Sequence, residues 1–134
     1  MDNEESRVMD SDKKLKVFLI EDASRIRTTL IELLQETGCI EVIGFAEDEG
    51  DALHQLRSKD WDAAIVDIGL RMGSGLGVLE GLKRDSKAYG KRFVFTNSPS
   101  AALQNRSLAL GADGFFDKSR DLNELVTQLT ALLQ

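Results

Sequence analysis

The sequence contains only one cysteine, one histidine and one proline among its 134 residues. A single cysteine excludes an internal disulfide, and a single histidine excludes a metal site built from several histidines. No apolar run approaches the roughly 20 residues that span a bilayer, and the polar N-terminus does not resemble a secretory signal. We therefore expect a cytoplasmic protein with no membrane partner.

The chain carries an excess of negative charge, with a formal net charge of −6, and so has no net positive charge to offer a polyanion. Nonspecific binding to nucleic acid needs basic surface, so we expect no direct binding of DNA or RNA by this chain. Its length suits one domain with a hydrophobic core. We expect that domain over residues 15–134, preceded by a polar N-terminal extension over residues 1–14.

Five short apolar segments predict strands. The central one runs from Ala63 into the carboxylate of Asp67, and its unbroken apolar character suits a strand buried on both faces of a parallel sheet. Ligands bind at the carboxyl ends of such strands, so Asp67 is expected at the functional edge of the sheet. The predicted strands cover residues 15–20, 39–46, 63–67, 91–96 and 113–117.

Between these segments the apolar residues recur with helical spacing. The first helix is expected to pack on the sheet through Ile26, Leu30, Leu33 and Leu34. The predicted helices cover residues 24–37, 48–58, 76–89 and 100–110, and a last one begins at Asp121. Strands that alternate with helices in this way predict an α/β fold.

Three conspicuous features receive structural interpretations. Cys39 is expected to be a small buried hydrophobe, and His54 a surface residue. The glycine-rich segment from Gly69 to Gly75 lacks the Gly-x-x-x-x-Gly-Lys-Ser/Thr pattern of a phosphate-binding loop. We interpret it as a loop that needs unusual backbone angles.

The expected topology is a flavodoxin-like, five-stranded parallel sheet in the order 2-1-3-4-5, with helices on both faces. In this order the first and third strands are neighbours. Glu21 and Asp22 after the first strand should therefore converge with Asp67 after the third. Thr96 ends the fourth strand, and Lys118 follows the fifth.

Three carboxylates at one edge of a sheet require a cation, since two of them about 4 Å apart repel by about 4 kcal/mol at an effective dielectric constant near 20. Oxygen ligands with open positions suit Mg²⁺, which retains waters and accepts phosphate oxygens. The hydroxyl of Thr96 and the ammonium of Lys118 suit the oxygens of a phosphoryl group in transfer. Asp67 is then a candidate nucleophile that forms an aspartyl phosphate.

With these residues in view, the chain resembles the receiver domains of two-component response regulators from about Leu15 to its end. The resemblance rests on the acid pair Glu21-Asp22, Asp67 in Ile-Val-Asp-Ile-Gly-Leu, Gly75 eight residues later, Thr96, and Gly-Ala-Asp-Gly-Phe-Phe-Asp-Lys ending on Lys118. It implies the (βα)5 receiver fold.

The resemblance also implies a metal site. Asp67 matches the family's phosphoacceptor, and Asp22 and Asp67 match its direct Mg²⁺ ligands. Glu21 matches an acid that acts through water, and the carbonyl of Gly69 matches the backbone ligand of the metal.

Five further positions match the family's switch residues or depart from its pattern. Thr96 resembles the switch hydroxyl, Lys118 the lysine that pairs with the phosphoryl group, and Phe115 the aromatic that changes rotamer, here without the more common tyrosine hydroxyl. Arg71 stands where a proline is common. Ser119 replaces a proline that often follows a cis bond, and a cis bond to serine would cost about 3 kcal/mol, so we do not expect it here.

The function implied is a phosphorylation-controlled signalling switch and not an enzyme, except that it assists its own phosphorylation and dephosphorylation. It would accept a phosphoryl group from a histidine kinase or phosphotransfer protein and then change its binding to a downstream protein. A phosphorylation-independent interaction module is the alternative, but the loss of an acid, hydroxyl or lysine expected for it is not found. A phosphohydrolase lacks its Asp-x-Asp pattern here, and two acids would oppose a flavin phosphate.

Overall fold

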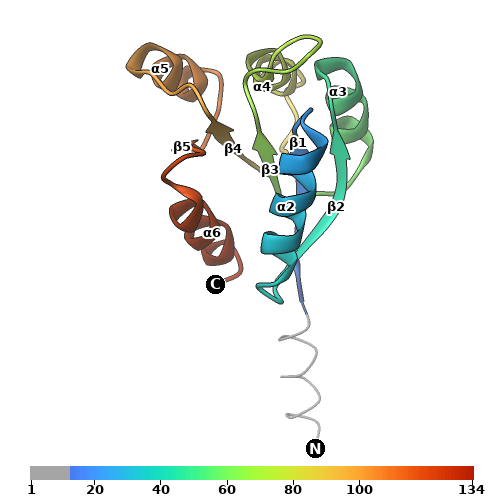
Figure 1. The fold of residues 1–134 in the computed structure, drawn as a ribbon. Helices are drawn as coiled ribbons and strands as arrows, with labels where there is room; N and C mark the ends of the chain where they lie inside the picture. Colours follow the sequence, from blue (N-terminus) through green and yellow to red (C-terminus); the bar gives the residue numbers. More distant parts are fainter. Residues whose placement is uncertain (1–12) are drawn as a thin grey trace, which may run out of the picture.

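A computed structural model describes residues 13–134 and shows one parallel sheet between two layers of helices (Figure 1). The strands are β1 (Leu15–Ile20), β2 (Ile40–Ala46), β3 (Ala63–Val66), β4 (Lys91–Thr96) and β5 (Gly114–Asp117). Their order is β2-β1-β3-β4-β5, which confirms the predicted topology. Most of the predicted extension over residues 1–14 lies outside the described residues. No helix within residues 13–134 has the length and apolar character to cross a membrane.

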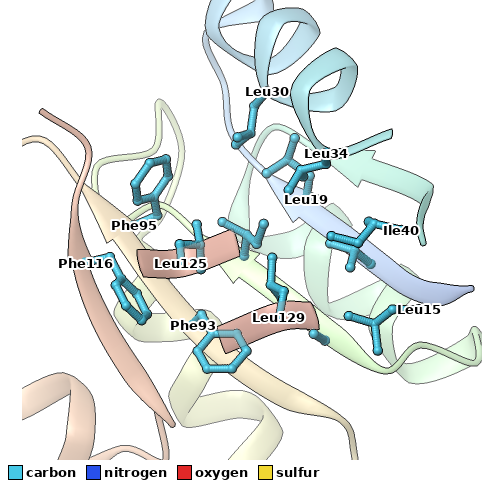
Figure 2. Packing of buried hydrophobic residues seen from close by; sticks show 13 residues of the cluster. Leu15, Leu19, Leu30, Leu34, Ile40, Phe93, Phe95, Phe116, Leu125 and Leu129 are labelled. Carbon is cyan, nitrogen blue, oxygen red and sulfur yellow. The ribbon is translucent and has the colours of Figure 1, made fainter. Parts of the chain in front are cut away.

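Helices α2 (Ser24–Gln35) and α6 (Leu122–Ala131) cover one face of the sheet. Figure 2 shows Leu30 and Leu34 of α2 and Leu125 and Leu129 of α6 against side chains of the strands. Each leucine that is fully buried stabilises the fold by roughly 2 kcal/mol. The strand residues of this cluster are Leu15, Val17, Leu19, Ile40, Ala63, Ile65, Phe93, Phe95 and Phe116.

The other face is covered mainly by α3 (Glu49–Ser58) and α4 (Gly75–Arg84). Ala52 and Leu56 of α3 and Val78 and Leu82 of α4 pack against this face. Helix α5 (Ala101–Ala109) lies beside β5 and buries only Ser107 (Figure 1). All four residues of β3 are buried, as its apolar run predicted.

Two of the four apolar residues predicted to anchor the first helix do not face the core. Leu30 and Leu34 are buried, whereas Ile26 and Leu33 are each 40% exposed. All four residues have helical spacing, but Leu30 and Leu34, which lie one turn apart on the same face, already fill the space above the sheet. Ile26 and Leu33 instead form an apolar edge of α2.

Helix α4 ends at Arg84, five residues before the predicted end at Tyr89. The chain leaves the helix through Ser86, whose φ is +53°. The hydroxyl of Tyr89 donates to Asp85 at 2.8 Å, and its ring stacks on Trp61 with 5.7 Å between centroids. This tertiary contact outweighs the local helical pattern. The other predicted elements agree with the structure to within one or two residues at each end.

His54 lies at the surface, as the sequence predicted, whereas Cys39 is less buried than the core hydrophobe that was expected. Cys39 is partly buried against the cluster shown in Figure 2, and His54 is exposed on α3. Neither side chain reaches the carboxyl edge of the sheet, where the candidate site is formed.

Candidate functional site

Neighbouring strands bring the three predicted acids together. Ile20 at the end of β1 pairs with Val66 at the end of β3, so the residues that follow both strands meet at the same edge. The backbone N–H of Asp67 donates to the carbonyl of Ile20 at 3.1 Å. Carboxylate oxygens of Glu21, Asp22 and Asp67 all lie within 4.8 Å of one another. The convergence predicted from the strand order is present.

Lys118 bridges two of these acids. Its Nζ donates to Oε1 of Glu21 and, at 3.0 Å, to Oδ2 of Asp67. The side chains are largely removed from water, with exposed fractions of 8% for Lys118, 3% for Glu21 and 12% for Asp67. The backbone N–H of Lys118 donates to the carbonyl of Thr96 at 2.9 Å, which fixes the end of β5 beside β4.

Burial and pairing act in opposite directions on the two central groups. Burial raises the pKa of Asp67, and this outweighs the charge and hydrogen bond of Lys118, which lower it; the charge of Glu21 raises it further. Burial lowers the pKa of Lys118, but its bonds to Glu21 and the charge of Asp67 outweigh burial, so the net pKa is raised. The positive charge of Lys118 is therefore shared between Glu21 and Asp67, and it neutralises the negative charge of Asp67 only in part.

The three acids have the chemistry and spacing of a site for a divalent cation. Mg²⁺ prefers six oxygen ligands and keeps several waters, so a few carboxylates within about 5 Å of one another suffice. Asp22 is only half buried, which leaves its carboxylate free to turn toward a cation. Gly69 is exposed two residues after Asp67 and pairs with Ser74 in an isolated bridge, so its carbonyl lies in the loop that borders the site.

A pocket of about 300 Å³ opens beside Asp67. Its lining includes Gly69, Thr96 and Ser98, and Thr96 itself is only 3% exposed. The hydroxyl oxygen of Thr96 accepts a bond from the backbone N–H of Ser98 at 3.3 Å, and its hydrogen remains available to a further acceptor. The pocket is large enough for a phosphoryl group.

Phe115 is half buried and does not line this pocket. It lies with Pro99 and Gln104 in a separate open pocket of about 340 Å³ between α5 and the end of β5. Its ring also packs against the small cluster that contains Leu79 and Val94. Its predicted rotamer change stays a prediction.

Ser119 holds the turn after Lys118 in place of the family's proline. The peptide bond between Lys118 and Ser119 is trans, as expected for serine. The backbone N–H and the hydroxyl of Ser119 both donate to Oδ1 of Asp117, at 2.9 and 2.7 Å. These hydrogen bonds lower the pKa of Asp117. Side-chain hydrogen bonds therefore shape this turn.

Gly75 packs directly against the main chain of the candidate phosphoacceptor. A Cβ at this position would lie 2.1 Å from the carbonyl oxygen of Asp67, which is too close for any real contact. Within the glycine-rich loop, unusual backbone angles are needed at Gly73, whose φ is +79°. The predicted need for unusual backbone angles is thus met at Gly73. Gly75 is required for a different reason, the close approach of α4 to the main chain of Asp67.

Gly75→Ala is expected to lower the free energy of unfolding by about 3 kcal/mol. The new methyl group would clash with the main chain of Asp67, and neither that segment nor the start of α4 can move away easily. Urea denaturation measures this loss. Gly50→Ala is the matched control, because its Cβ would meet only Oδ1 of Asp48 at an ordinary 3.7 Å. A Gly75→Ala protein as stable as the control would contradict the close packing of α4 on Asp67.

An ion-pair network beside the acids was not predicted from the sequence. Arg27 is only 9% exposed although it is charged, and it pairs with Glu47, which also pairs with Arg71. A charged residue on the buried face of a helix, such as Arg27 on α2, needs a partner of opposite charge. Its partner Glu47, and Arg71 beyond it, lie in loops, and no local sequence pattern identifies them.

Comparison with known proteins agrees with this geometry. The family described as "Response regulator receiver domain" matches residues 17–130. The two-component response regulator PhoP of Pseudomonas aeruginosa is 29% identical over 120 residues, which cover 90% of this chain and 52% of PhoP. A protein-glutamate methylesterase/protein-glutamine glutaminase of Methanospirillum hungatei is 31% identical over 113 residues, which cover 83% of this chain and 33% of that protein.

Solved structures show the same fold. A two-component response regulator of the LuxR family from Aurantimonas sp. superimposes with a TM-score of 0.83 at 24% identity, covering 90% of this chain and 86% of that one. The chain spans about a third to just over half of the length of the first curated relatives it matches. The acids, the hydroxyl and the lysine described above all fall within the matched segment, and this chain belongs to the receiver-domain family of two-component response regulators.

Proposed function

We propose that this receiver domain takes a phosphoryl group from a histidine kinase or phosphotransfer protein onto Asp67, with Mg²⁺ as its cofactor. The observation that carries the proposal is the group of Glu21, Asp22 and Asp67, two of which pair with Lys118, beside a pocket lined in part by Thr96. The same fold could serve as a phosphorylation-independent interaction module. The complete set of reactive side chains favours the switch.

In the proposed transfer, a carboxylate oxygen of Asp67 attacks phosphorus while the bond from phosphorus to the donor's histidine nitrogen breaks, and the nitrogen keeps the electron pair. Asp22, Asp67 and the carbonyl of Gly69 would hold Mg²⁺, with Glu21 acting through water, and the ion would supply positive charge for the phosphoryl oxygens. Lys118 stabilises another of these oxygens, and Thr96 donates its hydroxyl hydrogen. The closeness of these residues at the edge of the sheet supports the proposed roles.

The signal would then leave the site through Thr96 and Phe115. Movement of Thr96 toward the phosphoryl group frees space at the end of β4, and Phe115 would move into a new rotamer. Its pocket between α5 and β5 would change shape, which would alter the affinity for a downstream protein. Such a change shifts an equilibrium between two conformations that exist already.

The direct test is the intact mass of the protein after incubation with Mg²⁺ and acetyl phosphate. We expect a gain of one phosphoryl group that is lost on alkaline treatment, as for an acyl phosphate. Reduction with borohydride and peptide mapping should locate it at Asp67. Modification of another residue, or none at all, would contradict the proposal.

An apolar groove next to the site suits a helix of the phosphodonor. It has a volume of about 360 Å³, and its lining includes the exposed Ile26 and Leu33 of α2 together with Leu122 and Lys118. Docking of the phosphodonor would explain why Ile26 and Leu33 form an apolar edge of α2 that does not face the core. A partner helix in this groove would hold its phosphohistidine beside Lys118.

Leu33→Glu is expected to slow transfer from a phosphorylated histidine protein about tenfold, while acetyl phosphate reacts at an unchanged rate. Radiolabelled transfer followed over time measures both rates. Leu108→Glu is the matched control, because Leu108 is similarly exposed at 45% but lies on α5. An equal effect of both substitutions, or of neither, would argue against docking at the groove.

The lifetime of the aspartyl phosphate should depend on Gly69 and Ser98, which line the pocket beside Asp67. A Cβ at Gly69 would meet no atom within 4 Å, so Gly69→Arg can shield the phosphoryl group and lengthen its lifetime. Ser98→Glu places a carboxylate that can orient water and should shorten it. We expect changes of about tenfold, which correspond to about 1.4 kcal/mol of activation free energy.

First-order loss of phosphate after removal of the donor measures these lifetimes. Gly69→Ala provides the control, because it changes the backbone preference at the same position without adding a long side chain. If the parent and both charged variants lose phosphate at one rate, the exposure of the pocket does not set the lifetime.

A further inference from the structure

Two arginines beside the acidic site share one glutamate. Nη1 of Arg27 lies 3.1 Å from Oε2 of Glu47, and Nη2 of Arg71 lies 3.1 Å from Oε1 of the same side chain. The exposed fractions of the side chains are 10% for Arg27, 33% for Glu47 and 61% for Arg71. The network therefore extends from the interior to the surface.

The buried end of this network holds the turn that carries two of the acids. Nη1 of Arg27 also donates to the backbone carbonyl of Glu21 at 2.8 Å. Its guanidinium lies over the ring of Phe45, 4.1 Å from the centroid, which helps to fix its position. Arg27 thus restrains the main chain immediately before Asp22, the half-buried acid.

The exposed end holds the loop that follows Asp67. Arg71 lies in this loop, which is also tied to the start of α3 by two hydrogen bonds. The backbone N–H of Glu49 donates to the carbonyl of Met72 at 3.1 Å, and Oε1 of Glu49 accepts from the backbone N–H of Ser74 at 3.0 Å. The loop is therefore anchored on the first residue of α3, and Glu47 lies in the short connection from β2 that leads into this helix.

We propose that Arg27, Glu47 and Arg71 form a positioning relay for the divalent cation. The relay fixes the turn with Asp22 and the loop with Gly69 relative to each other, and these are the two segments that flank Asp67 in the proposed metal site. None of its three side chains needs to touch the metal. Residues that orient metal ligands in this way typically change affinity by roughly 10- to 100-fold when they are replaced. The inference rests on the proposed function, since it concerns the same cation.

Arg71→Ala tests the relay at its exposed end, where the fold is least dependent on the side chain. We expect the dissociation constant for Mg²⁺, measured by calorimetry, to rise about fivefold, which is below the range for a buried partner. The midpoint of urea unfolding in a chelator should stay at the parent value, because an exposed ion pair contributes little to stability. Arg71→Lys keeps the charge and should restore most of the affinity.

Arg57→Ala is the matched control. It removes an ion pair of similar exposure, in which Nε of Arg57 lies 2.8 Å from Asp85 with side chains 47% and 22% exposed. This pair joins the carboxyl end of α3 to the residue after α4, away from the acids. Mg²⁺ affinity of the control should equal that of the parent within twofold.

Glu47→Gln should weaken Mg²⁺ binding about tenfold, because it releases both arginines at once. The rate of phosphorylation by acetyl phosphate then separates positioning from chemistry. We expect the Mg²⁺ concentration for half-maximal rate to rise about tenfold in Glu47→Gln, while the rate at saturating Mg²⁺ stays within twofold of the parent.

The relay is refuted if the parent binds Mg²⁺ and both Arg71→Ala and Glu47→Gln bind it equally well. It is also refuted if Arg57→Ala weakens binding as much as Arg71→Ala does, since the effect would then follow from any lost ion pair. A parent that binds no Mg²⁺ would refute the cofactor in the proposed function together with the relay.

Discussion

An Asp67→Asn variant is expected to take up no phosphoryl group from acetyl phosphate or a phosphohistidine protein under conditions that modify the parent. An amide is not a nucleophile toward phosphorus, and the other acids of the site do not replace it, because Glu21 is held by Lys118 and Asp22 is proposed to bind the metal. Intact mass and radiolabel incorporation measure the loss. Asp60→Asn, at an exposed position before β3, should be modified like the parent.

The same variant should be more stable than the parent in a chelator at neutral pH. Burial raises the pKa of Asp67 in the folded protein above its ordinary value of 3.8, so the folded state binds this proton more tightly than the unfolded state. The contribution of Asp67 to stability is present in acid and is lost as the pH rises from 3.8 through the raised folded-state pKa. At pH 7 the ionised carboxylate therefore opposes folding, and the amide removes this effect.

Added Mg²⁺ should reverse the order. The parent gains free energy of unfolding as it binds the cation, by about 2.7 kcal/mol at 100 times the dissociation constant. Asp67→Asn, which lacks one proposed ligand, should gain much less. Urea denaturation of the parent and of Asp67→Asn, each with chelator and with Mg²⁺, gives the four free energies of unfolding to compare.

The phosphate uptake of the variant tests the site itself. If phosphate uptake survives in Asp67→Asn, the proposed phosphoacceptor is wrong.

The topology could be predicted because the strands are short, apolar and regularly separated, and parallel connections have one handedness. The strand order then placed Glu21, Asp22 and Asp67 together, although about 45 residues separate the two segments. Lys118 could be placed for the same reason. Each of these residues lies one or two positions after the end of a strand, so its place depends on the sheet more than on the loops.

Features that depend on side-chain packing between elements could not be predicted. The end of α4 is set by the stacking of Tyr89 on Trp61, which are far apart along the chain. Arg27, Glu47 and Arg71 belong to three different segments, and helical periodicity gives no information on which charges will meet. Ile26 and Leu33 follow the helical pattern but line a groove. Periodicity alone does not separate a core face from a binding surface.

Lys118→Ala is expected to lower the free energy of unfolding by about 3 to 5 kcal/mol in a chelator at pH 7. Its ammonium is the partner of both Glu21 and Asp67, and all three side chains are at least 88% removed from solvent. Without it, two carboxylates remain buried beside each other with no opposing charge from this position. Exposed Lys16 is the matched control, and Lys16→Ala should change stability by less than about 0.5 kcal/mol.

Two further measurements separate lost charge from lost packing in Lys118→Ala. Mg²⁺ should restore part of the stability, because a bound cation replaces some of the missing positive charge. The loss should also shrink as the pH is lowered, because Lys118 lowers the pKa of Asp67 in the parent and its removal lets that pKa rise further. The folded variant then binds protons more tightly than the unfolded chain, and its stability increases in acid.

The variant should still accept phosphate on Asp67 but should transmit it poorly, since the phosphoryl group loses the one ammonium that contacts its carboxylate in the described part of the chain. Lys118→Met, which keeps apolar bulk without charge, should behave like Lys118→Ala in both respects. If Lys118→Met instead retains parental stability at pH 7 and shows no gain with Mg²⁺, packing by the lysine stem and not its charge holds this edge of the sheet together.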